Sequence, residues 1–118
     1  MEKIKPLIPT LREKKRYISF EIITDSNAEF PQVRREIMNS FQRLYGEKGV
    51  ADAGIIMLSN LYSSKTKKGV IRVSHKNTDK LRLSLAMVKK IDGKDAIIKS
   101  IKTSGMLKKA SESAMIKP

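Results

Sequence analysis

The chain has 118 residues, which predicts one domain, residues 1–118, with a single core. It contains 25 basic and 12 acidic residues, and the resulting formal net charge of +13 favours an anionic partner. The absence of cysteine excludes disulfides, thiolate zinc sites and cysteine nucleophiles. Because no apolar run approaches the ~20 residues of a membrane span and the N-terminus lacks the apolar core of a secretory signal, we expect a cytoplasmic protein with no membrane partner.

The positive charge is unevenly distributed along the chain. Residues 1–60 carry 10 basic and 8 acidic side chains, a net charge of +2. Residues 61–118 carry 15 basic and 4 acidic side chains, a net charge of +11. This asymmetry predicts one strongly positive face on the folded domain.

Residues 1–15 are predicted to form an extended basic arm, because two prolines interrupt them and they show little apolar periodicity. The arm leads without a spacer into a strand predicted over residues 16–24, where apolar side chains alternate. A positive arm rooted in a sheet suits the binding of a polyanion at a fixed place on a domain. The cations at this junction are Arg12, Lys14, Lys15 and Arg16.

Helical spacing of apolar residues predicts a helix over residues 30–45, with Gly46 at its C-terminal cap. Its buried face is predicted to consist of Val33, Ile37, Phe41 and Leu44. Two apolar runs, residues 55–62 and 69–75, predict strands that pair as a hairpin. The lysines at the tip of this hairpin are Lys65, Lys67 and Lys68.

A second helix is predicted from Asn77 or Thr78, either of which can cap it, to about residue 90. A fourth strand is predicted over residues 96–103, and residues 106–115 suggest a short helix in the C-terminal segment 105–118. Alternation in the fourth strand predicts that Ile97, Lys99 and Ile101 lie on one face. Ile98, Ser100 and Lys102 are predicted to lie on the other face.

The predicted order over residues 16–104 is strand, helix, strand, strand, helix, strand. This βαββαβ order is typical of an α+β ferredoxin-like sandwich, the fold of RNA-recognition domains, with a four-stranded antiparallel sheet. Right-handed crossovers place both helices on one face of the sheet. The N-terminal arm, the terminal helix, RNA or a protein partner would cover the other face.

RNA-recognition domains with this element order stack bases on aromatic residues of the third strand. The third strand here opens with Lys68-Gly69, as that signature does, but Val70, Arg72 and His75 stand where the aromatic residues belong. Base stacking is therefore disfavoured, and phosphate contact and shape recognition of a structured RNA remain. The predicted RNA-binding residues form two patches, the first Arg12, Lys14, Lys15 and Arg16, and the second Lys65, Lys67, Lys68, Arg72 and Lys76.

No constellation of residues in the sequence predicts catalysis or metal binding. His75 is the single histidine, and no clustered carboxylates accompany it. Asp92 and Asp95 flank a turn, and Lys94 between them argues against a magnesium site there. We therefore expect no catalytic residue, no metal ligand and no cofactor in this chain.

Three blocks of sequence resemble the archaeal ribonuclease P protein component 2 family. They are LIPTLREKKRYISFEII at residues 7–23, KKGVIRVSHK at residues 67–76 and IDGKDAIIKSIKTSGMLKKA at residues 91–110. The first block is the most specific, and the three together extend over nearly the whole chain. The helix predicted over residues 30–45 resembles the family only in its apolar pattern.

The resemblance implies a ferredoxin-like subunit of the ribonuclease P endoribonuclease, which removes the 5′ leader of precursor tRNA. It implies that this chain binds the catalytic domain of ribonuclease P RNA, that the RNA catalyses the hydrolysis with magnesium, and that precursor tRNA is an indirect partner. It also implies pairing with ribonuclease P protein component 3, association with the other protein subunits, and a heterotetramer formed through two copies of component 2. We expect Met106 and Leu107 to contribute to partner binding.

Two alternatives use the same fold. A general structured-RNA-binding protein or ribosome-associated RNA chaperone would bind many RNAs equally well and would not need component 3. A small ferredoxin-like enzyme would carry a bound ligand or metal, and the missing catalytic cluster argues against it.

Overall fold

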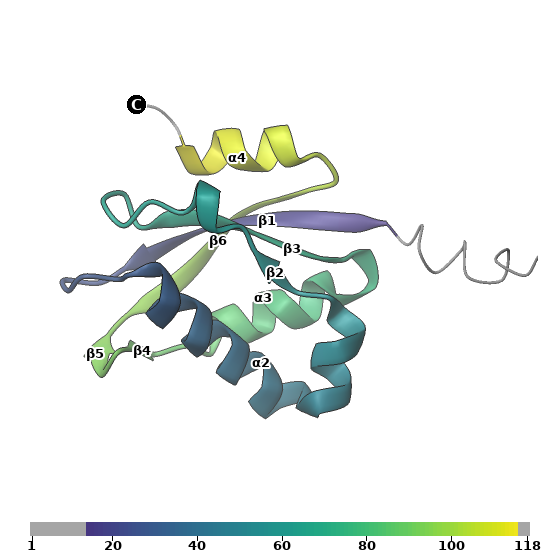
Figure 1. Ribbon diagram of the computed structural model, residues 1–118, viewed down its shortest axis with the longest axis horizontal. Coiled ribbons are helices and arrows are strands. Elements are labelled where there is room, and N and C mark those ends of the chain that lie inside the picture. The colour runs from purple at the N-terminus through teal and green to yellow at the C-terminus, as the bar shows by residue number, and fades with distance from the viewer. Residues whose placement is uncertain (1–13, 116–118) are drawn as a thin grey trace, which may run out of the picture.

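The computed structural model describes residues 14–115 and places a four-stranded sheet between two helical layers (Figure 1). Arg12 and the rest of the predicted arm before residue 14 lie outside the described residues. The helices and strands are β1 (Lys15–Ile23), α2 (Phe30–Ala53), β2 (Ile56–Met57), the 3-10 helix η2 (Ser59–Leu61), β3 (Lys68–Ser74), the 3-10 helix η3 (His75–Asn77), α3 (Thr78–Ala86), β4 (Lys90–Ile91), β5 (Lys94–Asp95), β6 (Ile97–Ser104) and α4 (Leu107–Met115).

The sheet has the strand order β2-β3-β1-β6, and all neighbouring strands are antiparallel. The first and last long strands of the chain therefore lie side by side, and β3 pairs with β1 on its other edge. This arrangement confirms the predicted α+β ferredoxin-like sandwich. A small β4–β5 hairpin connects α3 to β6.

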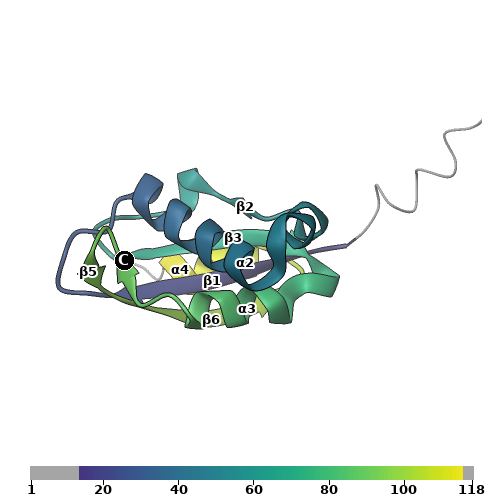
Figure 2. The same ribbon diagram turned by 90° about the horizontal axis from the view of Figure 1, so that it is seen from below.

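Helices α2 and α3 lie over one face of the sheet (Figure 2), and the main core lies between them and the sheet. Ile18, Phe20 and Ile22 of β1 are at most 3% exposed and face this layer. They pack with apolar residues that recur at helical spacing on the two helices. The buried helix residues are Val33, Ile37 and Phe41 of α2, and Leu81 and Leu85 of α3.

The first helix is longer than predicted and is broken at Gly46. Gly46 has φ 74° and ψ −180°, a conformation that suits glycine and interrupts the helix where the sequence predicted its end. A second helical stretch then continues to Ala53, and Gly54 with φ 60° closes it. Leu44, predicted to be buried, is 40% exposed.

Two other predicted elements were too long. The run over residues 55–62 forms a strand only at Ile56–Met57 and then turns into η2. The second helix ends at Ala86 instead of near residue 90, and the Met87 N–H donates its last hydrogen bond to the Leu83 carbonyl. After this helix, Val88 and Ile91 are still buried, although the chain that carries them is no longer helical.

Helix α4 packs on the other face of the sheet, against β1, β3 and β6 (Figure 1). Ala110 is fully buried against Val70, with Tyr17, Leu58 and Leu61 around them. Of the four covers that the sequence left open for this face, the terminal helix is therefore the one observed. No helix within residues 14–115 combines the length and the apolar character that a membrane crossing requires.

Candidate nucleic-acid interface

The first predicted patch lies where β1 begins. Lys14 is exposed, and its carbonyl oxygen accepts a hydrogen bond from the His75 backbone N–H at 2.9 Å. The His75 Nδ1 atom lies 3.2 Å from the same oxygen. These contacts bring Lys14 next to the start of η3, where Lys76 is also exposed.

Lys15 and Arg16 follow in β1, and both side chains are half-buried. The Arg16 Nη1 atom donates a hydrogen bond to the Lys15 carbonyl at 3.2 Å and lies beside Gly105. The Lys15 ammonium group lies beside Gly54 at the C-terminal end of α2, where helix carbonyls favour a cation. Both side chains therefore contact other parts of the protein.

The second predicted patch is divided by the length of β3. Lys68 opens this strand, whereas Lys76 follows its other end, roughly 25 Å away at about 3.3 Å per residue. The Lys67 ammonium donates a hydrogen bond to the Thr24 carbonyl at 3.0 Å, so part of its role is to hold the hairpin connection. Lys76 thus belongs with Lys14, and Lys65, Lys67 and Lys68 form a separate group at the opposite end of the sheet.

Arg72 occupies the middle of β3, on the face that carries α4, between Tyr17 of β1 and Ile56 of β2. Its Nε atom is buried and has no hydrogen-bond partner among the described residues. Burial of such a donor without an acceptor costs about 1–3 kcal/mol. This nitrogen therefore does not stabilise the fold.

Two lysines of β6 that sequence reasoning did not select, Lys99 and Lys102, are exposed on this same face of the sheet. Sequence alternation placed them on opposite faces. The pairing of β1 with β6 shifts by one residue between Ser19 and Phe20, and Ile101 is the extra residue. This β-bulge turns both lysines to the α4 side, and a pattern of period two contains no signal for it.

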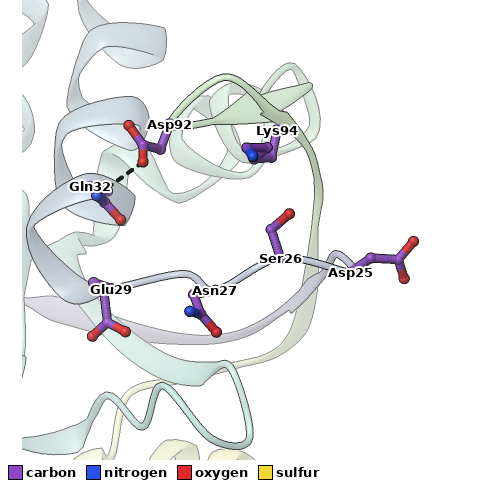
Figure 3. Close-up of a pocket in the computed structure, with 7 residues that line it drawn as sticks. All are labelled: Asp25, Ser26, Asn27, Glu29, Gln32, Asp92 and Lys94. Atoms are coloured by element: carbon purple, nitrogen blue, oxygen red, sulfur yellow. Dashed lines mark hydrogen bonds between the residues drawn. The ribbon is translucent and has the colours of Figure 1, made fainter.

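A polar pocket of about 520 Å³ lies at the end of the molecule opposite Lys14, between the loop after β1 and the β4–β5 turn (Figure 3). Asp25, Glu29, Asp92 and Lys94 are among the residues that line it, and the Asp25 carboxylate points away from the others (Figure 3). The Gln32 Nε2 atom donates a hydrogen bond to Asp92 at 3.2 Å. The carboxylates of this pocket disfavour a phosphate ligand there.

The carboxylates near this turn form no metal centre with one another. Asp95 accepts a hydrogen bond from the Lys90 ammonium at 2.8 Å, and this bond together with the lysine charge lowers the pKa of Asp95. Within residues 14–115, no group of three or more histidine, cysteine, aspartate or glutamate residues is arranged to hold a metal ion.

The fold and its cations together define an α+β sandwich that presents positive charge on strands, without a recognisable catalytic constellation among residues 14–115. The family model of the Rpp14/Pop5 family matches residues 16–115, and the chain belongs to this family. The family resemblance predicted from the three sequence blocks is therefore confirmed.

Curated relatives match the chain over nearly its whole length. It is 36% identical over 109 residues to ribonuclease P protein component 2 of Methanosarcina mazei, with 92% of this chain and 90% of the relative covered. It is 34% identical over 117 residues to the protein of the same name from Pyrococcus horikoshii, with 99% and 96% covered. A chain in the cryo-EM structure of yeast ribonuclease MRP shares the fold, with a TM-score of 0.63, 18% identity and coverage of 80% of this chain and 76% of that one.

Proposed function

We propose that this chain is a protein subunit of ribonuclease P and acts in the removal of the 5′ leader from precursor tRNA. The observation that carries the proposal is the match to ribonuclease P protein component 2 of two archaea at 34–36% identity over more than nine-tenths of the chain. The net charge of +13 and the strand-borne cations are the properties that binding of a structured RNA requires.

The mechanism that we propose is electrostatic. Packing RNA helices against each other brings phosphates close together, and fixed lysine and arginine side chains lower that repulsion and release counterions. The RNA performs the hydrolysis with its own magnesium in this proposal, and the protein supplies no catalytic residue and binds no cofactor. The chain then lowers the magnesium concentration at which the RNA adopts its active fold.

The protein partners of the proposed subunit are component 3 and the other ribonuclease P proteins, with precursor tRNA reached through the RNA. Met106 and Leu107 are 54% and 40% exposed at the start of α4, so their apolar surface is available for a protein contact. Self-association within a heterotetramer is part of the same proposal.

Competition binding tests this proposal against a general RNA chaperone. Labelled ribonuclease P RNA from the same source is bound to the full chain together with component 3, and is then displaced with unlabelled RNAs. We expect unlabelled ribonuclease P RNA to displace it at a concentration at least about tenfold lower than an unrelated structured RNA of equal length. Equal displacement by the two competitors, with no effect of component 3, would favour the chaperone and overturn the proposal.

A further inference from the structure

Five charged residues of three neighbouring strands, Glu21, Lys68, Arg72, Lys99 and Lys102, face the same side of the sheet. Residues paired across antiparallel strands project from one face. Tyr17 and Val70 pack on Ala110 of α4, which identifies that face as the α4 side. The pairs on it are Tyr17 with Arg72, Ser19 with Lys102 and with Val70, and Glu21 with Lys68 and with Lys99.

The β-bulge in β6 places Lys99 and Lys102 on the same face of the sheet. In a regular strand, side chains three residues apart point to opposite faces. The extra residue Ile101 corrects this difference, so that Lys99 and Lys102 flank β1 on the same side as Lys68 and Arg72 of β3. The Cα atoms of the four cations then lie within roughly 10 by 13 Å, given strands about 4.8 Å apart and a rise of about 3.3 Å per residue. They surround the place where Ala110 of α4 packs on Val70.

Only one acidic side chain of these three strands accompanies the four cations. It is Glu21, which lies between Lys68 and Lys99 in the register of the sheet. Among the described residues, no ion pair within 4 Å joins Glu21 to either lysine. Lys99 and Lys102 are exposed and Lys68 and Arg72 are half-buried, so the two β6 lysines offer the most accessible charge of the four.

We propose that Lys68, Arg72, Lys99 and Lys102 form a phosphate-binding array, which binds the backbone of the RNA beside α4. This proposal rests on the proposed function, because it takes RNA as the ligand. It adds the surface to which the RNA binds. It differs from both predicted patches, because it joins two residues of the second patch to two lysines of β6 and excludes Lys76.

Protection of a sheet edge and contact with a protein partner both account for the array less well than RNA binding does. Lysines on an edge strand such as β6 block unwanted strand pairing, but Lys68 and Arg72 belong to β3, which is paired on both sides. A protein partner is disfavoured because lysine is depleted at protein interfaces.

The test compares two charge-matched double variants of the full chain. K99Q/K102Q removes the β6 half of the array, and K48Q/K89Q removes two exposed lysines on the opposite, helical side of the molecule. The dissociation constant is measured against salt concentration for ribonuclease P RNA and for an unrelated structured RNA of equal length. For K99Q/K102Q we expect the slope of log K against log salt to fall in magnitude by about 2, with at least about tenfold weaker binding at about 0.15 M salt. For K48Q/K89Q the slope should remain that of the wild type.

A single variant, E21Q, is expected to bind RNA more tightly, a result that misfolding cannot produce. Removal of the acidic group between Lys68 and Lys99 should strengthen binding of both RNAs about threefold. E47Q, which removes an exposed carboxylate from α2, should leave binding unchanged.

Several results would overturn the array. One is an equal loss of RNA affinity in the two double variants, and another is unchanged RNA affinity in E21Q. A third is that K99Q/K102Q loses binding of component 3 but keeps binding of RNA. A fourth is that K99Q/K102Q self-associates in sedimentation while its RNA affinity is unchanged. Because phosphate contacts carry no sequence preference, the array is tested on both RNAs even if wild-type protein binds them equally. Equal binding of the two RNAs by the wild type would overturn the proposed function and leave the array standing.

Discussion

Tyr62 shows how one residue joins three parts of the chain. Its ring lies 6.3 Å from that of Phe20 in the sheet and 6.1 Å from that of Phe30 at the start of α2, and its hydroxyl donates a hydrogen bond to the Ala28 carbonyl. Gly69 makes room for these rings, since a Cβ there would lie 2.9 Å from both Phe20 and Tyr62. The glycine of the Lys-Gly pair, which resembles an RNA-recognition signature, is therefore required by aromatic packing.

Burial, with a smaller contribution from Glu29, raises the pKa of Tyr62 from 10.0 to about 12. The folded state thus holds this proton more tightly than the unfolded state does, so the stabilisation is complete below about pH 10 and is lost as pH rises from about 10 to 12. We expect the ultraviolet absorbance of phenolate to show one phenol titrating near pH 12 in the wild type and none there in Y62F. Y45F serves as the control, and a high-pH phenol that persists in Y62F would contradict the burial of this hydroxyl.

Among the elements, β6 and α4 determine which side chains are exposed on the face of the sheet opposite α2 and α3. The apolar alternation in β6 was visible in the sequence, but its bulge depends on how β1 pairs with it, and no local pattern encodes that pairing. For α4, the apolar pattern predicted a helix without saying where it docks. Its buried contact is small, centred on Ala110 and Val70, and is separate from the main core on the other face.

We predict that A110D detaches α4 while the rest of the domain stays folded. The substitution buries a carboxylate against Val70 and should cost about 1–3 kcal/mol. Hydrogen exchange should become fast in α4 and stay slow in β1 and β3, and one cooperative thermal transition should remain. A51D, which changes an exposed alanine of α2, should leave exchange in α4 unaltered. Collapse of the whole domain in A110D would show that α4 belongs to the main cooperative unit.

For the whole molecule, the order and type of the main helices and long strands followed from apolar periodicity at positions such as Ile18, Ile37 and Leu85. The candidate interface followed only in part. Sequence proximity grouped Lys68 with Lys76, which β3 separates. It placed Lys99 and Lys102 on opposite faces, because strand register across distant segments decides which side chains share a face.

Charge of both signs occurs at the end of the molecule near the β4–β5 turn. Asp25, Glu29 and Asp92 line the pocket there, and the Lys67 ammonium donates a hydrogen bond to the neighbouring Thr24 carbonyl. The strand cations of the proposed array lie on the α4 side of the sheet.

The most direct test of the central claim is reconstitution of precursor tRNA cleavage. Ribonuclease P RNA, component 3 and this chain, all from one source, are combined, and removal of the 5′ leader is followed across a magnesium titration. We expect cleavage at lower magnesium only when both proteins are present, because their cations replace part of the screening that magnesium supplies. An unchanged magnesium requirement, with ribonuclease P RNA bound no more tightly than unrelated RNA, would contradict the assignment of this chain as a ribonuclease P subunit.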